Sequence, residues 1–567
     1  MKYPRDCGLT IHNSDSIRQL LLAMKLKSEN GENGPAQPGS SKPVERYPMK
    51  KVTRFLPGVP RLAPILCVFI LMSASVKRAQ NPAAGPSEQE KKYWTRMETA
   101  DRQIAAEVKA HSELMKNLEY LTTQIGPRLT GSPEMQKASA WTLQRFQDYG
   151  FDAHLETTQV SHAWYRGLDS GEIVTPLHLT VEIHSYGWAK ATDGEATGPV
   201  VFVADVSREA VEKQRDKLKG AIVAMGIPRP VPPAGQPAAD AFDATEPESA
   251  PGHHRDPNAP PGLSFADRLN VYKLVGEAGA LAILSDSNKP DGLFNMSRVS
   301  PCCDPTPLAA AFINHEDYAL LYRLSQAGPV SMRINLKGTF SPGPAPASIT
   351  VAEIKGSELP EERVIIGGHL DSWDLGQGAL DNGTGAMATL EAARAMKALG
   401  WKPKRTLTFI LFVGEELGGI GSKLFLTNHQ AEVPKIDAAL VLDTGTGRVT
   451  SIALENLWET ARQMSTIYHP LQDVFDLFPL EARFYDGSDH ISFIRAGVPG
   501  YICVQAPALY REVHHSQSDT FGQAIPEEIN QAAAVIASWL WNVSEYPEAL
   551  PHHPSIPHET YLGTPTP

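Results

Sequence analysis

Apolar and polar positions alternate in a regular way over the C-terminal half of this 567-residue chain. Between residues 341 and 545, short apolar runs are separated by stretches in which apolar residues recur every three to four positions. Near-continuous apolar strands that alternate with helices are typical of a mostly parallel sheet covered on both faces. The predicted fold class is therefore α/β, with a mixed, mostly parallel sheet between helices. The predicted strands are SITVAEI, RVIIGGH, TLTFILFV, AALVLD and GYICVQA.

The remainder of the chain divides into segments that differ in composition and in apolar pattern. Residues 76–174 read as a linker followed by helices that belong to the same domain, with Ser132 and Pro133 starting one of them. Residues 175–340 are richer in short β-type runs and predict an inserted β-rich domain. Within it, residues 228–262 are crowded with Pro, Ala and Asp and predict a disordered loop, and residues 546–567 predict a disordered tail.

Residues 1–75 combine a polar extension with a signal peptide. The apolar segment APILCVFILMSAS at 63–75 is shorter than the about 20 residues that a membrane span needs, but it suits the apolar region of a signal peptide. Basic residues precede it, and Met49 begins a complete signal by itself, so Met49 is a candidate start. We expect an exported protein, secreted or periplasmic/lumenal, without stable membrane insertion after processing. An uncleaved membrane anchor is the alternative.

Charge and cysteine content exclude some classes of partner and of metal site. The formal net charge is −12 and the pI about 5.9, which argues against a nucleic-acid partner. The five cysteines show no spacing typical of a thiolate metal site and are too few for a disulfide scaffold. The adjacent Cys302 and Cys303 could pair or stay reduced. Any metal must therefore be held by carboxylates and imidazoles.

Carboxylates and imidazoles stand at or after the ends of several predicted strands. In open α/β sheets, ligands bind beyond the carboxyl ends of the strands, and these ends lie along one edge. Two imidazoles and three or more carboxylates, without sulfur, suit a pair of divalent cations. The residues at or after the strand ends are His369, Asp381, Glu415, Glu416, Asp443 and the pair His514–His515.

A pair of metals at this edge would promote hydrolysis through a shared, bridging water. Of the adjacent Glu415 and Glu416, one can bind metal while the other faces the water as general base. Asp371, two residues after His369, is expected to hold the second nitrogen of that imidazole.

The motifs HLDSWDLGQGALDNGTG, GEELGGIGS, LDTGTG, GSDHISFIRAGVPG and HHSQSDT resemble the di-zinc aminopeptidase and glutamate-carboxypeptidase family, and in particular its carboxypeptidase Q-like group. The resemblance covers about residues 93–545. It implies the zinc-peptidase fold, an inserted protease-associated domain, two Zn²⁺ per chain and a possible homodimer. It also implies a cis peptide after Asp381. Asn382 departs from the aspartate that is common in this group.

The resemblance further implies individual roles. Asp381 is the expected bridging ligand, and Glu415 the expected base. His369 and Asp443 would complete one zinc site, and Glu416 and His515 the other. His515 is preferred to His514 because three residues separate it from Asp519 and Thr520, as in the family pattern; His514 is expected to support or pack. Asp489 and His490 could orient substrate or have a structural role.

The predicted function is that of a zinc-dependent exopeptidase, a hydrolase acting on dipeptides or short peptides. An aminopeptidase acting on longer peptides is the first alternative, since the metal site would be the same. A glutaminyl cyclase and a non-catalytic binding homologue are less favoured, because every expected ligand and the base are retained.

Overall fold

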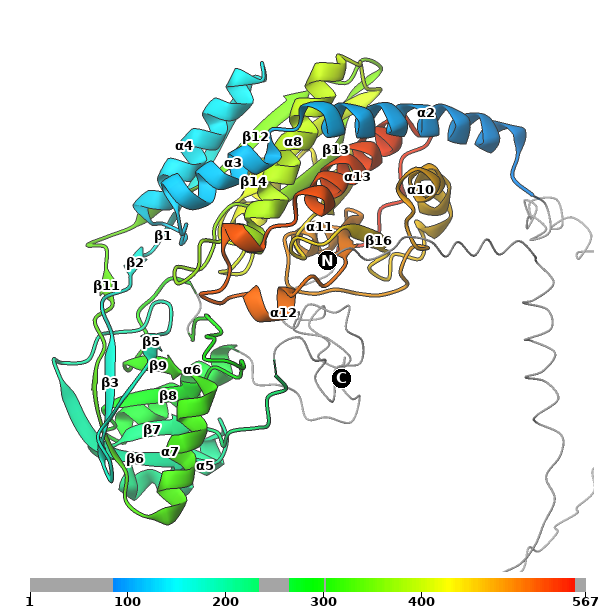
Figure 1. Cartoon of the computed structure of the whole chain (residues 1–567). Coiled ribbons are helices and arrows are strands. Elements are labelled where there is room, and N and C mark those ends of the chain that lie inside the picture. The colour runs from blue at the N-terminus through cyan, green and yellow to red at the C-terminus, as the bar shows by residue number, and fades with distance from the viewer. Residues whose placement is uncertain (1–84, 234–264, 300–301, 556–567) are drawn as a thin grey trace, which may run out of the picture. The chain divides into compact units, whose positions relative to one another are not determined.

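The computed structural model describes residues 85–233, 265–299 and 302–555 (Figure 1). The predicted signal segment and most of the predicted loop at 228–262 lie outside these residues.

A seven-stranded mixed sheet forms the centre of the fold. Four of its five inner strands are parallel to one another, and antiparallel pairing occurs toward both edges. The α/β fold class predicted from the sequence is confirmed. In spatial order the strands are β1 (Ala153–Val160), β12 (Ala345–Ile354), β14 (Arg405–Phe412), β13 (Leu359–His369), β15 (Ile436–Val441), β17 (Gly500–Gln505) and β16 (Val449–Ala453).

The strands β1 and β16 were not predicted. In β1, AHLETTQV, only the first and last residues are buried, because an edge strand exposes polar side chains to solvent. The five predicted strands are all present. Candidate ligands lie at or shortly after the ends of β13, β14 and β15.

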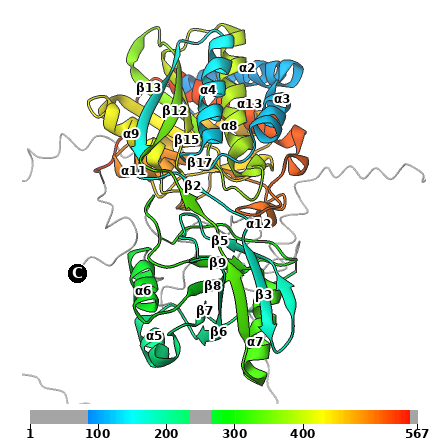
Figure 2. The same cartoon turned by 90° about the vertical axis from the view of Figure 1, so that its left-hand side faces the viewer.

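Helices cover both faces of this sheet (Figure 2). On one face, α8 (Thr384–Leu399) and α13 (Pro526–Glu545) contact each other and both β13 and β14. On the other, α9 (Ile420–Asn428) contacts α11 (His490–Arg495). Further helices of the N-terminal and C-terminal parts are α2 (Glu88–His111), α3 (Leu114–Glu119), α4 (Pro133–Asp148) and α10 (Ala461–Phe475). As predicted, Ser132 caps α4 and Pro133 is its first residue.

A second, eight-stranded sheet has its own apolar cluster, which includes Ile222, Leu284 and Met332. The strands, in spatial order, are β4 (Leu179–Val181), β3 (Ser170–Thr175), β10 (Ser331–Asn335), β6 (Ala196–Val203), β7 (Ile222–Met225), β8 (Ala282–Asp286), β9 (Ala310–Ile313) and β5 (Ile183–Ser185). Its helices are α5 (Arg208–Gln214), α6 (Phe265–Glu277) and α7 (His315–Ala327). We call this part the inserted domain; its predicted boundaries stay a prediction. Cys302 and Cys303 form a disulfide.

The chain after α13 contacts the core as far as it is described. Leu550 is buried, and its backbone N–H donates to Asp437 Oδ1 at 2.5 Å. His553 N donates to Gly497 O at 3.2 Å. The Pro- and His-rich composition of this segment predicted disorder from residue 546. That prediction missed the buried, apolar Leu550, which attaches the segment to the core. None of the described helices is long and apolar enough to cross a bilayer.

Candidate metal centre

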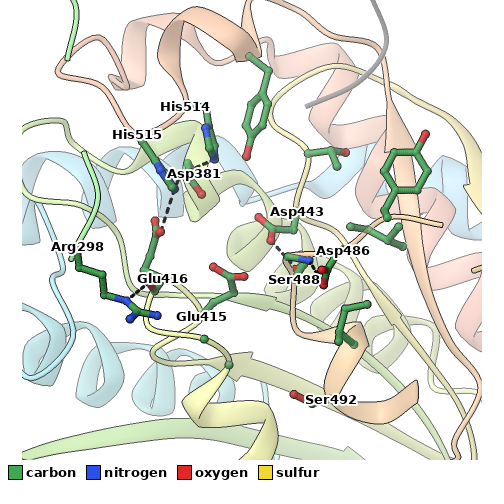
Figure 3. A pocket seen from close by; sticks show the side chains of 18 of the residues that line it. Arg298, Asp381, Glu415, Glu416, Asp443, Asp486, Ser488, Ser492, His514 and His515 are labelled. Atoms are coloured by element: carbon green, nitrogen blue, oxygen red, sulfur yellow. Dashed lines mark hydrogen bonds and ion pairs between the residues drawn. The ribbon is translucent and has the colours of Figure 1, made fainter. Parts of the chain in front are cut away.

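The carboxyl ends of the parallel strands bring four of the five predicted ligands, Asp381, Glu416, Asp443 and His515, to one pocket (Figure 3). The fifth, His369, does not line the pocket but lies against Asp381 and Asp443. His369 is the last residue of β13, and Glu415 and Glu416 follow β14. Asp443 follows β15 in the same way. The remaining imidazoles come from the loop after the short helix α12 (Tyr510–Val513), which follows β17.

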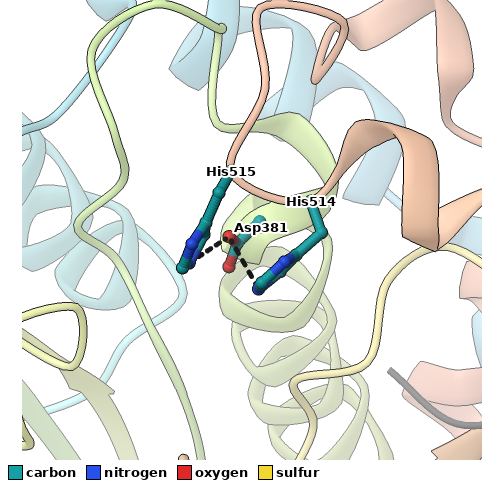
Figure 4. A group of neighbouring side chains, drawn as sticks. All are labelled: Asp381, His514 and His515. Carbon is teal, nitrogen blue, oxygen red and sulfur yellow. Dashed lines mark ion pairs between the residues drawn. The ribbon is translucent and has the colours of Figure 1, made fainter. Parts of the chain in front are cut away.

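Asp381 lies between the two halves of this centre. Its Oδ1 is 3.3 Å from His369 Nε2, and its Oδ2 is 3.5 Å from His515 Nε2. Figure 4 shows the imidazoles of His514 and His515 both pointing toward that carboxylate, with His514 Nε2 3.8 Å from Oδ2. Asp381 belongs to the irregular turn η3 (Ala379–Gly383) before α8, and the Asp381–Asn382 peptide is cis. One carboxylate therefore faces imidazoles from the end of a strand and from a distant loop.

Each half contains a further carboxylate. Asp443 Oδ1 is 3.1 Å from His369 Nε2, while Ser488 Oγ donates to Asp443 Oδ2 at 2.5 Å. Glu416 Oε2 is 2.9 Å from His515 Nε2. The structure thus brings together all five predicted ligands; the division of these residues between two ions stays a prediction.

Glu415 also lines the pocket, with Oε2 4.0 Å from His369 Nε2. Asp371 contacts His369 Nδ1, but its backbone oxygen lies closer to this nitrogen than its carboxylate does. His369 Nδ1 bonds the backbone oxygen of Asp371 at 2.9 Å, whereas the Asp371 carboxylate is 3.5 Å away. That carboxylate instead accepts hydrogen bonds from Thr130 Oγ1 at 2.7 Å and from the N–H of Glu415 at 3.3 Å. Asp371 therefore supports both the imidazole and the backbone of Glu415.

The donor set fits divalent cations. Two groups of side chains, Asp381 with His514 and His515, and His369 with Glu415 and Asp443, are compact enough to hold an ion each. Buried Asp381 Oδ2 and Glu416 Oε1 have no hydrogen-bond partner among the described residues. Such buried oxygens are costly unless a cation or water pairs with them. Oxygen and imidazole nitrogen ligands without sulfur suit zinc and similar ions.

Burial dominates the electrostatics of the centre. It raises the pKa of Glu415 well above the usual range, and the charges of Asp443 and Glu416 add to the rise. It lowers the pKa of His515 to about 4 and that of His514 well below its usual value, so both imidazoles are neutral near pH 7. Neutral imidazoles can bind metal directly, and a divalent cation would favour the ionised carboxylates.

The departure at Asn382 has a structural explanation. Its side chain does not face the ligands: Nδ2 donates to Leu442 O at 2.8 Å, and Oδ1 accepts from Gly385 N at 2.9 Å. An amide satisfies both partners, whereas an ionised carboxylate could not donate to the Leu442 carbonyl. The asparagine therefore binds backbone groups beneath the metal centre and does not alter the set of side chains that face a metal.

Asp489 and His490 are not among the described residues that line this pocket. Both are fully buried at the start of α11, where His490 Nε2 lies 2.9 Å from Tyr485 O and 3.6 Å from Glu455. Of the two roles that the sequence left open, this placement favours the structural one.

Sequence reasoning did not find Arg298, Ser488 or the contacts of Trp373. Arg298 comes from the inserted domain, lines the pocket, and donates from Nε to Glu416 O at 3.2 Å. Trp373 donates from Nε1 to Glu416 Oε2 at 2.7 Å. No local motif could have indicated these contacts, because each joins distant parts of the chain.

Comparison with known proteins agrees with this architecture. Residues 350–540 match the model of peptidase family M28. Carboxypeptidase Q of Rattus norvegicus is 31% identical over 455 residues, which cover 79% of this chain and 89% of that protein. The crystal structure of a peptidase M28 precursor from Shewanella amazonensis superposes with a TM-score of 0.66 at 24% identity, covering 82% of this chain and all of that one. A zinc aminopeptidase from Bacillus subtilis gives a TM-score of 0.55 at 18% identity, covering 78% and 98%.

Proposed function

The chain belongs to peptidase family M28, and we propose that within this family it is a di-zinc exopeptidase that hydrolyses dipeptides or short peptides. The observation that supports this most is the position of Asp381, whose two oxygens face His369 and His515 over 3.3 and 3.5 Å. A carboxylate so placed can serve two cations at once.

Two zinc ions would be held by His369, Asp381 and Asp443 on one side and by Asp381, Glu416 and His515 on the other; when bound, zinc supplies Lewis-acid polarisation of a carbonyl and acidifies water. The side chain of Glu415 is the general base. It accepts the proton of the attacking water and passes it to the leaving amine as the peptide bond breaks. Asp371 holds the N–H of Glu415 and so keeps this base in place.

Pocket size and charge support a short substrate with a free carboxylate. The pocket measures about 230 Å³, below the roughly 300–1,000 Å³ of sites for drug-sized ligands. Two arginines, Arg298 and Arg495, lie among its described lining residues. A guanidinium is well suited to a carboxylate, whose two oxygens it can bind together. The similarity to a protein named carboxypeptidase Q points the same way.

An aminopeptidase is the second candidate. Acidic Asp486 also lines the pocket and could bind a free amine, and the fold is shared with a zinc aminopeptidase. A screen of free dipeptides against amino-blocked and carboxyl-blocked versions separates the candidates. The proposal expects cleavage to be lost on blocking the carboxylate; loss only on blocking the amine would favour the aminopeptidase.

We further propose that the protein is exported and that its signal segment is removed. The support is the basic and apolar pattern of residues 50–75. N-terminal sequencing of the exported protein tests this: the expected first residue lies shortly after Ser75, and a terminus upstream of Met49 would contradict it.

A further inference from the structure

A lysine of the inserted domain has its charged end buried beside the metal centre. Lys289, which follows β8, is 4% exposed. Its Nζ donates to Arg511 O at 2.6 Å and to His514 O at 2.6 Å. These carbonyls belong to the end of α12 and the residue that follows it. Carbonyls at a helix end lack partners within the helix and are stabilised by a cation, so Lys289 holds the chain where it leaves α12.

The same segment of the inserted domain also forms hydrogen bonds with the next residues of this loop. Met296 N donates to His515 O at 2.7 Å. Phe294 N donates to Gln517 Oε1 at 2.9 Å, and Gln517 Nε2 donates to Gly292 O at 3.0 Å. The carbonyls of His514 and His515 and the side chain of Gln517 are therefore bound to one segment of the inserted domain, residues 289–296.

His515 needs such support because of its backbone. Its φ is +55°, in the left-handed region that residues other than glycine rarely adopt. Such a conformation persists only where surrounding contacts impose it. It aims the imidazole at Asp381 and Glu416, 3.5 and 2.9 Å away. The contacts to Lys289 and Met296 are the ones that hold the carbonyls of residues 514 and 515.

We propose that Lys289 is a positioning residue of the metal centre: by holding the backbone of His514, it keeps His515 in place to bind the second metal. This inference rests on the proposed di-zinc function. With this role of Lys289, the inserted domain is a structural part of one metal site. The other site, at His369 and Asp443, does not depend on Lys289.

The test is zinc titration of the metal-free, full-length chain against a competing chelator. Lys289→Met keeps the length of the side chain but removes its charge and donors. We expect one site to bind zinc about 10- to 100-fold more weakly, the range seen when support of a metal ligand is lost, while the other changes little. Lys289→Arg should restore much of the loss. Lys273→Met, at an exposed position of α6 in the same domain, is the matched control and should bind as the unmodified chain does.

Should Lys289→Met fail to fold, as judged by near-UV circular dichroism, Gln517→Leu replaces it. This variant removes both side-chain hydrogen bonds of half-buried Gln517 without burying a charge, and should weaken the same site selectively. Unchanged affinities in a folded variant, or equal weakening of both sites, would overturn the inference. If the unmodified chain bound no second zinc, the proposed function itself would fail, whatever the variants did.

Discussion

The indole Nε1 of Trp373 donates a hydrogen bond to Glu416 Oε2 at 2.7 Å. This bond fixes one oxygen of the carboxylate, while the other, Oε1, has no hydrogen-bond partner among the described residues. The Trp373 ring also meets the His515 ring nearly edge-on, with centroids 5.8 Å apart. One tryptophan thus touches both residues that are proposed to complete the second zinc site with Asp381.

Replacing Trp373 by phenylalanine should therefore weaken one zinc site and spare the other. The ring contact with His515 can be kept, but Glu416 loses its donor, and we expect about a 10-fold loss of affinity at that site. Zinc titration against a chelator measures it. Trp458→Phe, at a side chain that is 58% exposed, is the control. Two sites of unchanged affinity in Trp373→Phe would show that this bond does not support metal binding.

Glu415→Gln should retain metal but lose turnover. The amide has nearly the same shape but cannot accept the proton of the attacking water, so kcat should fall by about 100- to 10,000-fold. Metal content and melting temperature should stay close to those of the unmodified chain. Glu358→Gln, at an exposed position, controls for the chemical change. Full activity of the Glu415 variant would remove this residue as the base.

Asp381→Ala should lose both metals together, because its two oxygens face ligands of both proposed sites. Elemental analysis of the dialysed variant checks this, with Asp193→Ala in an exposed loop as control. One zinc retained at full occupancy would mean that Asp381 does not bridge.

Asp101 in α2 makes stability depend on pH. It is fully buried, and its Oδ2 accepts from Asn542 Nδ2 at 3.2 Å, while its Oδ1 and Asn542 Oδ1 have no hydrogen-bond partner among the described residues. Burial raises the pKa of Asp101 to about 7, from about 3.9 in the unfolded chain. The folded state then binds the proton more tightly, so this contribution to stability is full below about pH 4 and is lost as the pH rises to about 7.

Asp101→Asn should consequently stabilise the fold above pH 7, by roughly 2 to 4 kcal/mol at most, because no charge is buried and a new N–H can meet Asn542 Oδ1. The gain should shrink as the pH falls toward 4. Melting temperatures of both proteins, measured in chelator at several pH values, check the sign. A variant that is less stable at pH 8 than the unmodified chain would refute it.

Much of the metal centre could be predicted because its ligands follow apolar strands. His369, Glu416 and Asp443 each lie at or just after a strand whose composition indicates burial, and the geometry of parallel sheets brings such positions together. The atom that holds His369 Nδ1 could not be predicted, since the carbonyl and the carboxylate of Asp371 are equally near in sequence. The role of Lys289 was also beyond reach, because it contacts His514 across 225 residues of chain.

The binding of two zinc ions around Asp381 is tested by the zinc content of the full-length protein, first stripped with chelator and then titrated with zinc while dipeptide hydrolysis is followed. We expect two zinc ions per chain, and activity that is lost on stripping and returns on reloading. Saturation at a single ion, or dipeptide hydrolysis that survives complete removal of metal, would contradict it.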